Sequence, residues 1–203
     1  IGASLPISIA GAFYYLLSYV DVLAVQAYRP SSDVAIYFAV QKLLALVAFV
    51  HFSIAATVAY RFSELRAAGR NDELAQFYAR SRRWTFWPSL AGVGFLLAFG
   101  WPLLWLFGPE FVSGYGLIGI LSIGLLARAV VGPAERLLIM FGQQKICAVV
   151  YTAAFVSNLA GCILLVPRFG LEGAAASTTA ALVLESAALF LLSRRQLIAP
   201  SPV

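Results

Sequence analysis

Residues 34–60 read VAIYFAVQKLLALVAFVHFSIAATVAY, and Lys42 is the one residue of this stretch that is charged at neutral pH. A helix that crosses the hydrocarbon core of a membrane needs about 20 mostly apolar residues, and this stretch exceeds that length. It lacks the strict alternation over about ten residues that marks the strands of a membrane barrel. The stretch therefore predicts a transmembrane α-helix.

The whole chain has the same character as this stretch. Its 203 residues are 62% hydrophobic and 11% charged, with a mean hydropathy of +0.88. Soluble globular proteins carry about 25% charged residues, so this chain cannot cover a water-facing surface of ordinary size. This composition argues against a soluble enzyme, a disordered chain and a disulfide scaffold. The predicted class is an all-α integral membrane protein.

Six apolar stretches are each bounded by charged or turn residues, which predicts six transmembrane helices in one bundle with no separate soluble domain. Short connectors join them, except for a long segment at residues 61–83. The chain begins with Ile1 and has no basic segment before its first apolar stretch, so we interpret it as a fragment or an internal start. The predicted helices span residues 5–25, 34–60, 84–107, 115–140, 146–166 and 173–192.

The distribution of Lys and Arg predicts the orientation of the helices. The second and fourth connectors and the tail carry nine of these residues, whereas the first, third and fifth carry only Arg29 and Arg168. Because Lys and Arg concentrate in cytoplasmic loops, we expect both ends of this chain to be cytoplasmic. The net charge of +5 then reports membrane topology, and no nucleic-acid partner is expected.

The connector at residues 61–83 contains an amphipathic stretch. Asn71 is a plausible N-cap, and Leu74, Phe77 and Tyr78 form an apolar stripe at helical spacing. We expect a surface helix that lies along the inner leaflet and leads into Trp84. A regulatory docking site is the alternative interpretation.

Ionisable residues inside a spanning segment are costly and mark function by default. Arg128 lies near the midplane of its predicted helix, and Glu135 follows seven residues later on the same face. Gly132 and Pro133 lie between them and should weaken or kink the helix. Glu185 lies past the midplane of the last helix, and Arg128 could pair with either acid.

Asp21 and Lys42 lie on antiparallel neighbouring helices at similar depth, so these two residues could also pair. Tyr15 and Ser18 continue a polar stripe with Asp21 that should face inward. This stripe is either a packing seam or the wall of a water-filled cavity. His51 and Arg136 lie close enough to the inner interface to reach it with their polar ends.

Enzymatic chemistry finds little support in the residues. The chain has a single His, no metal-ligand spacing and no phosphate-binding loop, so we expect no metal, no cofactor and no catalytic activity.

Cys147 and Cys162 lie roughly 22 Å apart on one predicted helix and cannot form a disulfide with each other. We interpret both as small packing residues.

Four stretches resemble one family of membrane proteins. Their order and spacing match those of the family's motifs. They are the turn Leu106-Phe107-Gly108-Pro109-Glu110-Phe111, the turn Met140–Lys145, the start of the last helix at Val166–Ala175, and the paired segments Asp21-Val22-Leu23 and Val34–Leu43. They are similar to motifs of polysaccharide and lipid-linked-oligosaccharide flippases. These flippases belong to the multidrug/oligosaccharidyl-lipid/polysaccharide exporter superfamily.

The resemblance implies that the six helices form the C-terminal lobe of a twelve-helix, inverted-V transporter whose N-terminal lobe is missing here. It implies a flippase that moves an undecaprenyl-diphosphate-linked oligosaccharide, as in O-antigen biosynthesis, across the bacterial inner membrane by alternating access. The implied partners are this lipid-linked oligosaccharide, membrane lipids, the N-terminal lobe and, as a further candidate, polysaccharide polymerase machinery. Lys42 falls where the family has its Arg/Lys-Leu motif.

The resulting hypothesis is that Lys42 and Arg128 line a cavity and contact the diphosphate of the cargo. The alternative role for both residues is structural, as partners of the acids named above. Two other functions stay open: a small-molecule or multidrug exporter of the same superfamily, and a membrane-embedded glycan-processing enzyme. The full set of cavity candidates is Lys42, Arg128, Asp21, Tyr15, Ser18, Glu135 and Glu185.

Overall fold

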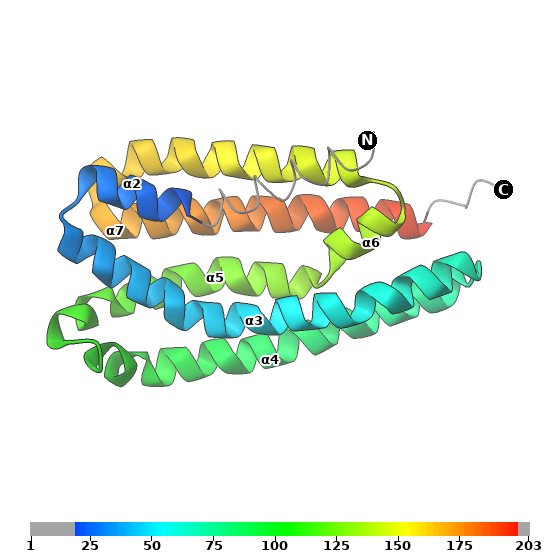
Figure 1. Cartoon of the computed structure of the whole chain (residues 1–203), viewed down its shortest axis with the longest axis horizontal. Coiled ribbons are helices and arrows are strands. Elements are labelled where there is room, and N and C mark those ends of the chain that lie inside the picture. Colours follow the sequence, from blue (N-terminus) through cyan, green and yellow to red (C-terminus); the bar gives the residue numbers. More distant parts are fainter. Residues whose placement is uncertain (1–18, 199–203) are drawn as a thin grey trace.

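The computed structural model describes residues 19–198, and this part of the chain is helical with no β-strand (Figure 1). The expected all-α class is therefore confirmed. Within residues 19–198, four helices are long and apolar enough to cross a membrane: Ser31–Ala67, Asn71–Trp105, Pro109–Val131 and Gln144–Leu197. The elements are α2 (Val20–Tyr28), α3 (Ser31–Ala67), α4 (Asn71–Trp105), η1 (Pro109–Gly114), α5 (Tyr115–Val131), α6 (Ala134–Met140) and α7 (Gln144–Ile198).

Helices α3 and α4 form a long antiparallel hairpin that extends beyond the other helices at one end (Figure 1). The turn between them uses Gly69, whose φ of 69° is accessible to glycine at little cost. The expected surface helix is wrong, because α4 runs without interruption from Asn71 to Trp105. Arg70 occupies the N-cap position and Asn71 is the first helical residue. The amphipathic stretch is thus the first part of a long helix, and its apolar stripe packs against α3.

The expected kink at Gly132 and Pro133 is confirmed as a complete break. Helix α5 ends at Val131 and α6 begins at Ala134. Gly132 adopts φ 66° and ψ −149°, and the proline ring that follows cannot donate a backbone hydrogen bond. Because the helix is interrupted, a spacing of seven residues no longer places Arg128 and Glu135 on one face.

Helix α7 bends back on itself at Gly170, which has φ 59° and ψ −132°. The bend produces two antiparallel arms, residues 144–169 and 171–198, which Figure 1 shows in yellow and in orange to red. The guanidinium of Arg29 lies against this bend, since a Cβ added to Gly170 would be 3.5 Å from Arg29 Cζ. Each arm is longer than the roughly 20 residues that a spanning helix needs.

The buried apolar residues form two main clusters along the bundle. One joins α2, α3, α4, α5 and the bend of α7, and the other joins α3, α4, the end of α5, α6 and the two free ends of α7. Cys162 belongs to the first cluster and Cys147 to the second, and both are free thiols, as the packing interpretation expects. Large apolar side chains such as Leu46 and Phe49 point outward and are about 70% exposed (68% and 70%). Such an outer surface suits lipid better than water.

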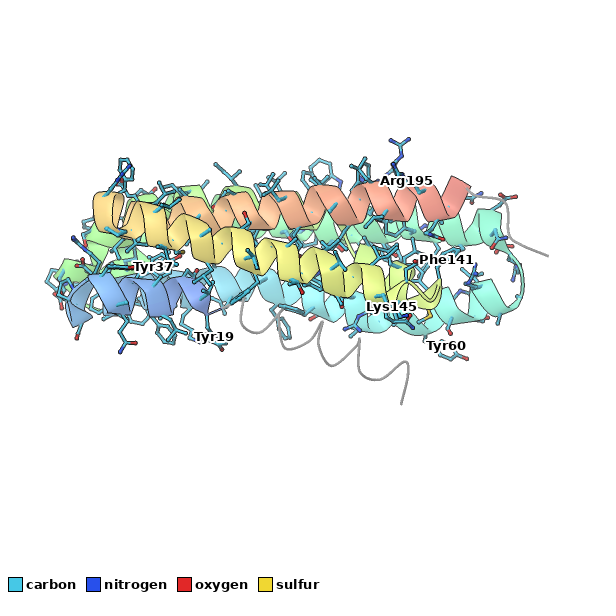
Figure 2. The ribbon with its side chains drawn as sticks, turned by 90° about the horizontal axis from the view of Figure 1, so that it is seen from above. Tyr19, Tyr37, Tyr60, Phe141, Lys145 and Arg195 are labelled. Carbon is cyan, nitrogen blue, oxygen red and sulfur yellow. The ribbon has the colours of Figure 1, made fainter. Side chains whose placement is uncertain are left out.

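The connectors separate to opposite ends of the bundle. The α2–α3 turn, η1 and the bend of α7 lie at one end, and the α3–α4 turn lies at the other (Figure 1). Figure 2 shows Tyr37 towards the first end and Phe141, Lys145 and Arg195 towards the second. We call the second end, which holds the Ala68 turn, the basic end. The expected second and fourth connectors and the tail, which hold nine Lys and Arg residues, belong to this end, although the helices α3 and α4 extend into the second of these connectors; Arg29 and Arg168 belong to the other end.

Candidate functional site

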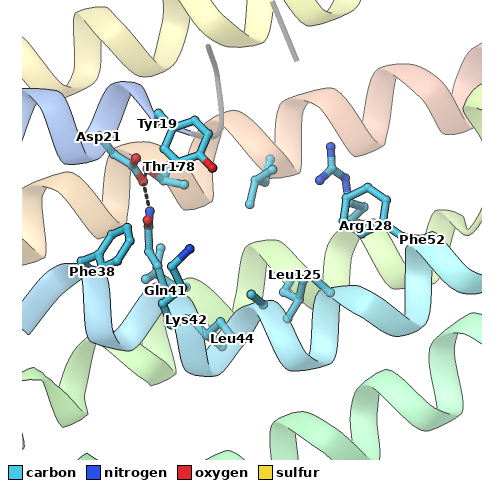
Figure 3. A pocket seen from close by; sticks show the side chains of 14 residues that line it. Tyr19, Asp21, Phe38, Gln41, Lys42, Leu44, Phe52, Leu125, Arg128 and Thr178 are labelled. Atoms are coloured by element: carbon cyan, nitrogen blue, oxygen red, sulfur yellow. Dashed lines mark hydrogen bonds between the residues drawn. The ribbon is translucent and has the colours of Figure 1, made fainter. Parts of the chain in front are cut away.

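A cavity of about 260 Å³ opens between α2, α3, α5 and the second arm of α7 (Figure 3). Three of the predicted site residues line it, and they come from three different helices: Asp21 from α2, Lys42 from α3 and Arg128 from α5. Apolar and aromatic side chains form most of the remaining wall. The other lining residues are Tyr19, Phe38, Gln41, Leu44, Ala45, Ala48, Phe52, Leu121, Leu125, Thr178 and Leu182.

Asp21 is the centre of a hydrogen-bond network in the wall of the cavity. Its side chain is buried, and one carboxylate oxygen, Oδ2, accepts hydrogen bonds from the Tyr37 hydroxyl at 2.8 Å and from Gln41 Nε2 at 2.7 Å. The Thr178 hydroxyl donates to the same oxygen at 2.9 Å. The other oxygen accepts the backbone N–H of Val22 at 2.8 Å. Four donors compensate a buried carboxylate well, and the network ties α2 to α3 and α7.

The expected pair between Asp21 and Lys42 does not form in the described part of the chain. Gln41, the residue before Lys42, faces Asp21 instead, because consecutive residues of a helix point about 100° apart. The Lys42 ammonium lies 4.5 Å from the centroid of the Phe38 ring, one helical turn away. No carboxylate within residues 19–198 forms an ion pair with it. Lys42 therefore offers a cationic group to the cavity.

Arg128 pairs with Glu185 across the interface of α5 and α7. Its Nη2 donates to Glu185 Oε1 at 2.7 Å. The glutamate side chain is 1% exposed and the arginine side chain 18% exposed. The acid is therefore buried, and of the two partners it is Arg128 that lines the cavity. Of the two acids that could have paired with Arg128, the structure brings Glu185 to it, while Glu135 lies beyond the helix break on α6.

The remaining site candidates divide into two groups. Glu135 and Glu185 do not line the cavity, although Glu185 holds the arginine that does. Tyr15 and Ser18 lie outside the described residues. The ring of His51 has a buried Nδ1 atom without a hydrogen-bond partner in residues 19–198, although the residue is partly exposed, and the expectation that it reaches the interface stays a prediction.

Sequence reasoning missed three polar residues of the Asp21 network. Tyr37 and Gln41 are one turn apart on α3, so a polar i, i+4 pair inside an apolar helix could have indicated an inward face. Asn158, on the first arm of α7, is buried, and its Oδ1 lies 3.4 Å from the Thr178 hydroxyl and 3.5 Å from Cys162 Sγ. A lone amide in an apolar helix is a comparable signal.

Comparisons with protein-family models, with curated proteins and with solved structures found no match to this chain. Within residues 19–198, no three His, Cys, Asp or Glu side chains gather closely enough to hold a metal ion. The cavity itself combines two cationic groups, one hydrogen-bonded carboxylate and an apolar wall.

Proposed function

We propose that this chain is one lobe of a transporter that moves an undecaprenyl-diphosphate-linked oligosaccharide between the leaflets of a bacterial inner membrane. The observation that carries the proposal is that Lys42 and Arg128, from two different helices, line one cavity. A diphosphate is an anion with several acceptor oxygens, which Lys and Arg bind through charge-assisted hydrogen bonds. The apolar wall beside them suits the polyprenyl chain that carries the diphosphate.

The charges around the cavity support an anionic cargo. The Asp21 carboxylate already accepts hydrogen bonds from four donors, and Glu185 lies buried behind Arg128. The ammonium of Lys42 and the partly exposed guanidinium of Arg128 are the cationic groups among the residues that line the cavity. A cation intended for this cavity would meet two like charges, which is unfavourable in a low-dielectric site.

We further propose that the lobe has six membrane passes and belongs to a twelve-helix transporter that works by alternating access. The two arms of α7, the α5–α6 pair, α4 and α3 supply five passes, and α2 is the end of the first. A cavity of about 260 Å³ is slightly smaller than the roughly 300–1,000 Å³ of ordinary ligand pockets, as expected if a second lobe supplies the opposite wall. The N-terminal lobe, membrane lipids and polymerase machinery are the proposed partners.

The positions of Lys and Arg support placing the basic end in the cytoplasm. The cargo would then enter from the inner leaflet and leave at the end that holds the bend of α7.

A small-molecule exporter of the same architecture is the second candidate. The observation that favours it is Asp21, because a carboxylate in the cavity wall could bind a cationic drug. Its four hydrogen bonds would first have to be exchanged for that ligand, which makes this candidate weaker.

Export of surface polysaccharide tests the proposal. In the full-length gene that encodes this lobe, the double variant Lys42→Ala, Arg128→Ala should abolish export in a flippase-null strain, a loss larger than its reduced amount of protein in the membrane explains. Arg128→Lys should retain part of the activity, because the charge survives. The control is Arg61→Ala, which removes one cation from an exposed pair with Glu64 far from the cavity. Normal export by the double variant, or efflux of a cationic dye lost in Asp21→Asn, would refute the flippase proposal.

A further inference from the structure

A second cavity, of about 460 Å³, lies at the end of the bundle opposite the basic end. It is bounded by the α2–α3 turn, η1, the start of α5 and the bend of α7, which lie together at one end in Figure 1. Its volume falls within the roughly 300–1,000 Å³ of ordinary ligand pockets. It shares no lining residue with the cavity that holds Lys42 and Arg128, so it is a separate site.

Both arginines that belong to this end of the bundle line the second cavity. Arg29 follows α2 and Arg168 precedes the bend of α7, so the fold brings them together from distant parts of the sequence. Lys and Arg are scarce in loops on the non-cytoplasmic side of a membrane protein, where the proposed orientation places this end. Their convergence on one cavity indicates a role for them other than setting the topology.

Two acids balance these two cations. Arg29 Nε donates to Asp33 Oδ2 at 2.8 Å, whereas Arg168 and Glu172 form no ion pair within residues 19–198. Residues four positions apart on an uninterrupted helix are neighbours and can pair, but the bend at Gly170 lies between Arg168 and Glu172. The cavity therefore has no net charge, yet its wall carries one cation and one acid that do not neutralise each other.

Exposed aromatic side chains place the second cavity at the level of lipid headgroups. Phe169 lines the cavity and is exposed, and Tyr28, Trp105 and Phe107 are exposed at the same end of the bundle. Aromatic side chains, Trp and Tyr above all, gather where the bilayer meets water. A ligand in this cavity can thus have its polar part among the charged residues while its apolar part lies along the bundle.

A phosphoethanolamine group matches the charges of this cavity. Its phosphate is an acceptor for the guanidinium of Arg168, and its ammonium carries three N–H donors for the carboxylate of Glu172. A purely anionic headgroup would meet two carboxylates, and a purely cationic ligand would meet two guanidinium groups. A choline headgroup has the same charges as ethanolamine, but its quaternary ammonium has no N–H group to donate.

We propose that the second cavity binds the phosphoethanolamine headgroup of a membrane phospholipid, with Arg168 on the phosphate and Glu172 on the ammonium. The Arg29–Asp33 pair completes the polar wall, and the Arg29 guanidinium lies against the bend that carries the other two residues. The site requires that this end of the bundle lies at a membrane surface. It does not depend on the proposed cargo.

Native mass spectrometry of the purified full chain, titrated with phospholipids of identical acyl chains, tests the site. The chain should bind one phosphatidylethanolamine more tightly than phosphatidylcholine or phosphatidylglycerol. Glu172→Gln should remove the preference for phosphatidylethanolamine over phosphatidylcholine, whereas Arg168→Gln should weaken both lipids alike, because they share the phosphate. We expect changes of roughly 2–5-fold, the range for charge pairs that stay accessible to water. The matched control is Arg195→Gln, which removes an exposed arginine at the basic end.

Loss of the preference in Glu172→Gln, with Arg195→Gln unchanged, supports the headgroup site. Equal binding of phosphatidylethanolamine and phosphatidylcholine by the unaltered chain would overturn it, and so would a preference that survives Glu172→Gln. Soluble phosphoethanolamine that binds as tightly as the lipid would mean that no acyl chain is needed, and would overturn the assignment to a phospholipid. Because the titration involves neither cargo nor transport, failure of the proposed function would leave this result unchanged.

Discussion

Arg128 donates to Glu185 at 2.7 Å, and the two residues are 57 positions apart on different helices. The exposure of the two side chains is unequal, because Glu185 is buried whereas Arg128 is partly exposed. Glu185 Oε2 has no hydrogen-bond partner among the described residues, so the guanidinium is the group that compensates the buried charge. Under the proposed function, this inequality lets one pair serve both stability and the binding of cargo.

Removing the arginine alone should destabilise the lobe. Arg128→Ala leaves a carboxylate buried without its cation, and breaking such pairs in soluble proteins costs about 3–5 kcal/mol. We expect a lower melting temperature in detergent and less protein in the membrane. The double variant Arg128→Ala, Glu185→Ala should recover most of this loss, because it removes the orphaned charge. Equal instability of the single and double variants would show that the two side chains are not coupled.

The Asp21 network should contribute to stability through its individual donors. Tyr37→Phe removes a buried hydroxyl that donates to the carboxylate, at a cost of about 0.5–1.5 kcal/mol or more because the acceptor is charged. Asp21→Ala should cost more, since it leaves the donors of Tyr37 and Thr178 buried without their acceptor. Thermal unfolding in detergent measures both changes. Tyr60→Phe is the control, because Tyr60 is 78% exposed, and a loss equal to that of Tyr37→Phe would contradict the prediction.

Two glycines of α5 should respond oppositely to alanine. A Cβ at Gly124 would lie 3.2 Å from the backbone Cα of Thr179, so Gly124→Ala should push α5 away from α7 and weaken the Arg128–Glu185 pair. A Cβ at Gly119 would meet nothing within 4 Å. Gly119→Ala should therefore be neutral or stabilise by up to about 1 kcal/mol, because alanine favours the helix. Circular dichroism during heating distinguishes the two. A stabilised Gly124→Ala variant would mean that the helices do not approach so closely.

The distribution of Lys and Arg predicts which end of the bundle faces the cytoplasm. With the native cysteines removed, a cysteine at Asn71 should resist an impermeant thiol reagent in intact cells and react after the cells are opened. A cysteine at Ser31, at the opposite end, should react in intact cells. The reverse pattern would invert the proposed orientation.

The lobe alone should not transport. Lys42 and Arg128 line one cavity, and the proposed transporter would hold its substrate between this lobe and a second one, as transporters built from repeats do. We expect the full-length gene, but not this chain by itself, to restore surface polysaccharide to a flippase-null strain. Restoration by the chain alone would contradict the half-transporter proposal, unless crosslinking showed that two copies had assembled.

Local features were predictable where local chemistry determines them. Long apolar stretches indicate helices, and the pair Gly132-Pro133 indicates a break. Depth along each helix also predicted Asp21, Lys42 and Arg128 as cavity candidates, and the structure brings these three residues to one cavity.

Choices between partners were not predictable, because helical periodicity gives the face of a residue but not the neighbour that meets it. Gln41 rather than Lys42 reaches Asp21, and these two differ by one position. The choice of Glu185 over Glu135 depends on the helix break at Gly132 and Pro133, which moves Glu135 off the face that carries Arg128. The continuation of α4 through Trp84 was missed for a related reason. An amphipathic stretch has the same sequence pattern whether it forms a separate surface helix or is the first part of a spanning helix.

The long hairpin of α3 and α4 has a consequence for handling this molecule. At 1.5 Å per residue, the 37 residues of α3 measure about 55 Å, whereas a hydrocarbon core is about 30 Å thick. Even a tilt of 40° would use only about 40 Å of that length. If α3 spans a membrane, the tip of the hairpin, which carries the exposed Arg61–Glu64 and Arg70–Glu73 pairs, therefore lies outside the hydrocarbon core as the end of a helical rod. A protein this small is otherwise hard to orient in electron micrographs, and a helical fusion at Ala68 would give it a visible marker at the far end of the rod from Asp21.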